Sequence, residues 1–172
     1  GDINIDTDIT INSTSSDVIN AQILNIGGVV SDSSYSTTDS DNHGNITFSG
    51  SFAGYRAAVG GIVGNGISNN VGPGAGAVNN GNITFTEDAQ LILSADIFLG
   101  GCVGITEASA VDGMTNNGNI VFKGDVLQWT TTSTNAETGE VTESKSGGNF
   151  RAGGVAGYFT SAHSNLVNNG KF

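Results

Sequence analysis

Few residues in this sequence are of the types that perform chemistry. The 172 residues include one cysteine, one tryptophan and two histidines, His43 and His163. Neither histidine lies in a recognisable Ser/His/Asp arrangement, and one cysteine with two separated histidines does not make a zinc motif. We therefore predict that the protein is not an enzyme and that it has no catalytic residues, metal ligands or cofactor.

The single cysteine, Cys102, follows a glycine pair in Gly-Gly-Cys-Val-Gly, where the sister segments carry Ile or Val. Because there is no second cysteine, no disulfide forms within the chain. A small side chain at an apolar position of a repeat is typical of core packing. We expect Cys102 to be a buried hydrophobic residue rather than a nucleophile.

Carboxylates are numerous: 16 acidic residues oppose 5 basic ones, and the formal net charge is −11. This charge repels nucleic acid, so we predict no nucleic acid partner. Polysaccharide lyases and hydrolases need carboxylates clustered on one face, but these do not recur at a common offset in the repeat. Two acidic stretches, 6–8 and 39–42, contain ligand types suited to calcium without the spacing of a known calcium loop. Whether calcium binds stays open.

Three residues are candidates for ligand contact. Arg56 and Arg151 occupy similar contexts, Tyr-Arg-Ala and Phe-Arg-Ala, so we expect them to project from one face as a basic pair for an anionic sugar. The alternative is an ordinary surface pair. Trp129 lies beside a threonine-rich segment that interrupts the repeat, where ligand contacts tend to accumulate. It either stacks on a sugar or protein partner, or anchors its own segment against the body of the protein.

The positions of these residues depend on a repeat in which two motifs alternate. The first is a Gly-Gly pair followed by small apolar residues, present at 27–30, 60–64, 100–104 and 153–157. The second is an asparagine-rich turn leading into a strand, present at 42–48, 79–85, 116–122 and 168–172. Turn glycines 44, 81 and 118 are 37 residues apart (81 − 44 and 118 − 81), whereas the next, Gly170, follows after 52 (170 − 118). We assign the extra residues to an inserted β-hairpin at 127–149.

This pattern predicts an all-β fold, a right-handed parallel β-solenoid (β-helix) of about four repeats. Alternating apolar and polar residues such as Ile46-Thr47-Phe48 give each strand one apolar face, which only stacked repeats can bury. Asparagine and glycine suit the sharp corners, and stacked asparagines can bond to one another. Handedness follows from the general bias of parallel crossovers. We predict a single domain, 1–172, with repeats at 27–59, 60–99, 100–152 and 153–172, and a cap or partial repeat at 1–26.

The glycine-rich segments, recurring with Asn-Gly turns, resemble the GLUG-type repeats of bacterial surface proteins, which include adhesin-like proteins. Segments 60–64, 100–104 and 153–157 match well, whereas the first copy has Ser31 in place of the closing glycine. The resemblance spans roughly 27–172. It implies a surface-displayed β-solenoid serving adhesion, and it carries over no catalytic residues.

We therefore expect a non-catalytic structural or adhesive segment of an extracellular or cell-surface protein that binds a glycan or an extracellular protein. Two alternatives stay open: a carbohydrate-active enzyme on the same fold, and a module that self-associates end to end through unpaired strand edges. No stretch approaches the roughly 20 apolar residues of a membrane helix, so we predict no membrane insertion. The sequence begins at Gly1 and stops soon after a strand-opening motif, so we expect the natural chain to be longer at both ends.

Overall fold

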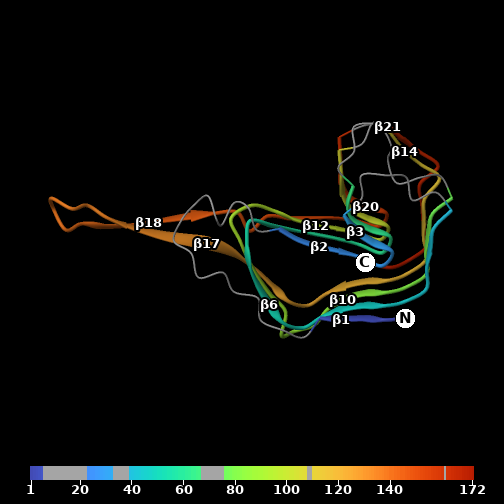
Figure 1. Cartoon of the computed structure of the whole chain (residues 1–172), viewed down its shortest axis with the longest axis horizontal. Coiled ribbons are helices and arrows are strands. Elements are labelled where there is room, and N and C mark those ends of the chain that lie inside the picture. The colour runs from blue at the N-terminus through green and yellow to red at the C-terminus, as the bar shows by residue number, and fades with distance from the viewer. Residues whose placement is uncertain (6–22, 33–38, 67–75, 108–109, 161) are drawn as a thin grey trace.

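The computed structural model describes residues 1–5, 23–32, 39–66, 76–107, 110–160 and 162–172. All regular elements in these ranges are β-strands, so the all-β prediction is confirmed. Within them there is no helix of the length and apolarity needed to cross a membrane. Equivalent strands of successive turns lie over one another in Figure 1, as expected for a parallel β-solenoid.

The described strands form six sheets, and apart from the return strand of the inserted hairpin each sheet is built from equivalent segments of successive turns. Sheet A contains β1 (Ile3–Ile5), β5 (Ile46–Phe48), β10 (Ile83–Phe85) and β16 (Ile120–Phe122). Sheet B contains β6 (Ser51–Gly54), β11 (Gln90–Leu93), β17 (Asp125–Thr134) and β18 (Val141–Ser146). Sheet C contains β2 (Ile23–Gly27), β7 (Arg56–Gly60), β12 (Ile97–Gly100) and β19 (Phe150–Gly153).

The remaining three sheets complete each turn. Sheet D contains β3 (Val30–Asp32), β8 (Val63–Gly66), β13 (Val103–Thr106) and β20 (Ala156–Phe159). Sheet E contains β4 (Asp41–Asn42), β9 (Val78–Asn79), β15 (Thr115–Asn116) and β22 (Val167–Asn168). Sheet F contains β14 (Ala110–Asp112) and β21 (Ala162–Ser164).

One 37-residue repeat forms one turn of the solenoid. The chain passes through sheets A, B, C, D and E in that order before it returns to sheet A, with sheet F between D and E in the third and fourth turns. Ile46, Ile83 and Ile120 align directly in parallel register. The regular spacing of the turn glycines therefore predicted both the architecture and the register. The right-handed sense of the coil stays a prediction.

The main core is a set of apolar columns, as the alternation within the strands predicted. Phe48, Phe85 and Phe122 stack along sheet A, with ring centroids 5.4 and 4.8 Å apart. Leu and Ile side chains from sheets B and C fill the space opposite, and most of them are fully buried. Each turn therefore buries its apolar face against the turns above and below it.

The corner between sheets E and A is held by a buried ladder of asparagine side chains. Asn79 shows the pattern: its Nδ2 donates to Gly81 O and to Asn116 Oδ1, both at 2.8 Å. Its Oδ1 accepts from Gly81 N at 3.2 Å and from Asn42 Nδ2 at 2.8 Å. Two donors and two acceptor positions are the full capacity of a side-chain amide. The ladder, which continues to Asn168, thus satisfies buried polar groups while it links the turns.

The two sequence motifs meet at this ladder. A Cβ added at Gly61, the second glycine of its pair, would lie 2.2 Å from Asn79 Cγ. The same conflict recurs in the other turns, between glycines 28, 101 and 154 and asparagines 42, 116 and 168, at 2.6, 2.3 and 2.4 Å. Any side chain larger than hydrogen would push the asparagine out of the ladder. The glycine pair and the asparagine turn are therefore two halves of one contact.

Sheet D folds back onto sheet C, and the closing glycine of the first motif allows this. A Cβ at Gly104 would lie 2.5 Å from Val59 N, and one at Gly157 would lie 2.5 Å from Leu99 N. Each of these glycines thus lies against the sheet C strand of the preceding turn. Ser31 occupies the same position in the first turn and is exposed, with no earlier sheet C strand in the described part of the chain. This explains why a serine is accommodated there.

The inserted hairpin is present and projects from the junction of sheets B and C (Figure 1). The first four residues of β17 pair in parallel with β11, from Asp125 to Gln128. From Trp129 onward β17 pairs antiparallel with β18, and Trp129 lies opposite Ser146. The hairpin lengthens the connection between sheets B and C, which in the third turn is only residues 94–96.

The buried ladder predicts a large difference between neighbouring asparagines. Replacing Asn79 with Ala removes four buried hydrogen bonds and interrupts the ladder, so we expect the free energy of unfolding to fall by at least about 3 kcal/mol. Asn80→Ala removes only an exposed contact, in which Asn80 Oδ1 accepts from Asn117 Nδ2, and should cost less than about 1 kcal/mol. Urea unfolding of the two variants measures this difference, and equal losses would contradict the role of the ladder.

The contact between the two motifs predicts that Gly61→Ala destabilises the fold by about 3 kcal/mol, because the new methyl group overlaps Asn79. Gly66→Ala is a matched control in the following strand, since its Cβ would meet nothing closer than 3.4 Å. Thermal unfolding monitored by circular dichroism compares the two. A Gly61→Ala protein as stable as the Gly66→Ala protein would show that the glycine pair is not required for packing.

Candidate binding surface

Sheet C carries different residues on its two faces. Ala57, Val59, Ile97 and Leu99 point into the main core and are fully buried. The intervening positions point to the other face, which we call the outer face of sheet C. Sheet D covers part of this face, where Ala58, Phe98, Ile105 and Tyr158 form a small separate cluster. This cluster consists of Ala58 and Phe98 from sheet C and Ile105 and Tyr158 from sheet D.

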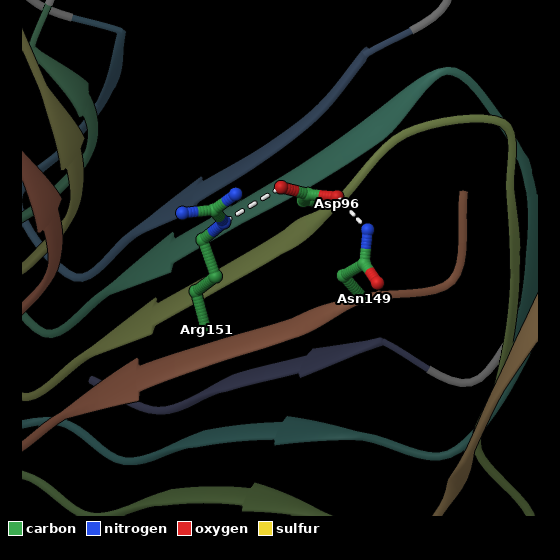
Figure 2. Close-up of polar contacts among 3 residues, drawn as sticks. All are labelled: Asp96, Asn149 and Arg151. Carbon is green, nitrogen blue, oxygen red and sulfur yellow. Dashed lines mark hydrogen bonds and ion pairs between the residues drawn. The ribbon is translucent and has the colours of Figure 1, made fainter.

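A polar cluster on this face is centred on Asp96 (Figure 2). Arg151 Nε donates to Asp96 Oδ2 at 2.7 Å, and Asn149 Nδ2 donates to Asp96 Oδ1 at 2.8 Å. The side chain of Asp96 is 16% exposed, whereas that of Arg151 is 49% exposed. A carboxylate bonded through both oxygens acts as a fixed support. It orients the guanidinium and the amide, which remain accessible from solvent.

Aromatic rings hold the same guanidinium from a second side. Arg151 Cζ lies 5.4 Å from the centre of the Tyr158 ring and 6.0 Å from that of Phe98. These rings are themselves in tilted contact, with centroids 5.5 Å apart. Cation–π contact and the charged hydrogen bond together restrict the side chain to one position. Arg151 is therefore ordered before any ligand binds.

Arg56 and Arg151 lie on the same outer face, but they are not equivalent in the repeat. Phe98 aligns with both Ala58 and Arg151, so the counterpart of Arg151 in the second turn is Ala58. Arg56 lies two positions earlier, in the column of Asp96 and Asn149. The two arginines thus share one face, as expected, but they occupy different columns, because their similar neighbours are not aligned in the register of the strands. Measured from the glycine pair, Arg56, Asp96 and Asn149 all lie four residues before the first glycine.

The surface between sheets C and D also contains buried polar atoms without hydrogen-bond partners. These are Arg56 Nε, Asn25 Oδ1 and Asn65 Oδ1, three of the five such side-chain atoms found in the described residues. Asn25 and Asn65 each donate through Nδ2 to Asp32 Oδ2 at 3.1 Å, which leaves their oxygens unused. Buried polar groups normally have partners, so these three atoms are an unusual feature of the packing between sheets C and D. They are shielded from the surface and are not themselves ligand contacts.

Trp129, the third candidate, lies at the base of the hairpin and is half-buried. It lies two residues after Leu127, which is 43% exposed and aligns with Ile92. Since alternate residues of a strand share a face, these three side chains form an apolar strip on the outside of sheet B. The structure thus places Trp129 on a different sheet from Arg56 and Arg151. Beyond it, every residue of β18 is exposed.

Other residues considered for chemistry have structural surroundings. Cys102 is fully buried among Ile62, Val103 and Met114, as expected, and burial raises the pKa of its thiol to about 12. Hydrogen bonds from the side chains of Ser164 and Asn165 hold the pKa of Asp112 below its usual value. The described ranges contain no group of three or more His, Cys, Asp or Glu side chains able to hold a metal.

The acidic stretch 6–8 lies outside the described residues. In the second acidic stretch, 39–42, Asn42 uses its Oδ1 to accept from Gly44 N at 3.0 Å and is committed to the ladder. Of the two histidines, His43 is exposed at its corner, and His163 contacts the Phe159 ring with centroids 4.2 Å apart.

Comparison with known proteins gave no match to a family model, to a curated protein or to a solved structure.

The burial of Cys102 predicts that the native protein resists thiol reagents. Because the thiolate is the reactive form and the pKa is about 12, almost none is present at about pH 8, and the sulfur is also shielded. Mass spectrometry after iodoacetamide treatment should find the folded protein unmodified and the urea-unfolded protein singly modified. Complete labelling of the folded protein would contradict the position of Cys102 in the core.

Proposed function

We propose that this chain is a non-catalytic structural and adhesive segment of a bacterial surface or secreted protein. In this proposal the solenoid is a rigid support, and the outer face of sheet C together with the hairpin contacts an extracellular glycan or protein. The resemblance of its glycine-rich segments to GLUG-type repeats favours this class of protein.

The observation that carries the proposal is the composition of the outer face of sheet C. It combines an oriented, half-exposed guanidinium at Arg151 with an accessible amide at Asn149. Polar side chains that are held in one position on a rigid strand, with hydrogen-bonding groups still available to solvent, are what a binding site requires.

The chemistry of this face favours binding over hydrolysis. Glycoside hydrolases generally place two carboxyl groups on opposite sides of the bond that breaks. The cluster contains one carboxylate, Asp96, and both of its oxygens already accept hydrogen bonds. A carbohydrate-active enzyme remains the main competing function, and the release of sugar would distinguish it.

A self-associating module is the second alternative, and exposed apolar residues on the fourth turn favour it. Phe150 is 40% exposed and Phe172 is 66% exposed. Phe172 also lines a pocket with Ile120 and Phe122. Sedimentation velocity over a range of protein concentrations measures this directly, since stacking through these residues makes the sedimentation coefficient rise with concentration.

An array of glycans and matrix proteins tests the proposed function. We expect the protein to bind at least one of them without releasing sugar, and we expect Asn149→Ala and Trp129→Ala each to weaken binding about tenfold or more. Lys123→Ala is the control, because its exposed side chain contacts only Glu87, at 3.7 Å. Released product would overturn the non-catalytic assignment. Failure to bind anything would leave a structural spacer.

A further inference from the structure

We propose that the outer face of sheet C recognises a carboxylated glycan, with Arg56 and Arg151 binding its carboxylate groups. This inference rests on the proposed function and names the chemical class of its ligand. The two arginines are the basic residues of this face, in a chain that has only 5 basic residues in all.

Arg56 has no ion pair among the described residues. Its side chain is half-buried, its Nε–H is buried without an acceptor, and no carboxylate among the described residues lies within 4.0 Å of it. A guanidinium stays charged at every physiological pH, so the exposed part of this side chain can bind an acceptor from outside the chain. A carboxylate fits best, because its two oxygens match the parallel N–H groups of the guanidinium fork.

Arg151 complements Arg56 because only part of its guanidinium is used. Nε is bonded to Asp96, while its two terminal nitrogens have no hydrogen bond among the described residues. Figure 2 shows one of these nitrogens turned away from Asp96, with the side chain reaching from β19 across β12 toward β7. The guanidinium of Arg151 thus extends toward the strand that carries Arg56.

The spacing of the two arginines suits a chain-like ligand. Arg56 and Arg151 are two strands and two residues apart, so their Cα atoms are separated by about 12 Å. A single small anion is too short to span this separation. The direction of the Arg151 side chain, toward β7, shortens the distance between the two guanidinium groups but does not change the spacing of the strands. A polymer lying along the solenoid axis would pass both side chains. Successive strands are about 4.8 Å apart, close to the advance of one sugar unit.

The rest of the surface favours a sugar polymer over an acidic peptide. Asn149, in the column of Arg56, is exposed, and its Oδ1 accepts no hydrogen bond among the described residues. A uronic acid polymer carries several hydroxyl donors per sugar along with its carboxylates, so one ligand type suits this amide oxygen and the guanidinium groups. An acidic peptide offers only one backbone N–H donor per residue. The glycan therefore accounts for more of the observed groups.

Calorimetric titration with hyaluronan oligosaccharides tests the inference, using the same oligosaccharides with reduced carboxyl groups as the paired ligand. We expect the acidic form to bind about tenfold or more tightly than the reduced form. Arg56→Gln and Arg151→Gln should each lower the affinity for the acidic form by about tenfold, which is the scale of one lost charged contact. Lys123→Gln removes the same charge elsewhere and should leave the affinity unchanged.

Thermal unfolding of each variant establishes that it is folded, and Arg151→Lys provides a second variant that keeps the charge but loses the fork. It should bind more weakly than the wild type and more tightly than Arg151→Gln. Equal binding of the acidic and reduced forms, or tighter binding of polyglutamate, would overturn the inference. If the array instead finds a neutral glycan or a protein, the proposed function stands while this inference fails.

Discussion

The fold depends on the contact between a buried asparagine and a glycine 14 to 18 residues before it in the chain. Asn79 fits against Gly61 with no room for a side chain, and it simultaneously uses its complete hydrogen-bonding capacity. This contact fixes where the chain turns from sheet C into sheet D and where it turns from sheet E into sheet A. Because it is repeated in every turn, the equivalent strands must stack in register.

That register determines which residues of successive turns lie side by side on the outer face of sheet C. Once the core columns are filled, the alternate residues of sheet C that sheet D does not cover can differ from turn to turn. In the column of Arg56 the second, third and fourth turns carry an arginine, an aspartate and an asparagine in succession. The regular backbone therefore brings together residues far apart in the sequence, such as Asp96 and Arg151. The regular backbone also accommodates the hairpin, because the hairpin lengthens only the connection between sheets B and C and leaves the asparagine ladder intact.

The sequence was sufficient to predict the solenoid, its 37-residue period, the inserted hairpin and the stacking of asparagines, because these follow from repeated motifs. It was not sufficient to show that Gly61 and Asn79 touch, since neither motif contains the other. The sequence also did not show that Arg56 and Arg151 lie in different columns of their shared face, because their aromatic neighbours Tyr55 and Phe150 are not aligned. Asp96 was overlooked as a support because its partner lies 55 residues away on the next turn. Only a register counted from the glycine pair brings the two together.

The ladder also has a direction. Every amide donates to the asparagine of the following turn, from Asn42 to Asn79, then Asn116 and finally Asn168. The hydrogen bonds of the series therefore all run in one sense along the solenoid axis. A turn placed in the reverse orientation would put donor against donor or acceptor against acceptor. The solenoid is in this sense a polar object, like a filament subunit with distinguishable ends.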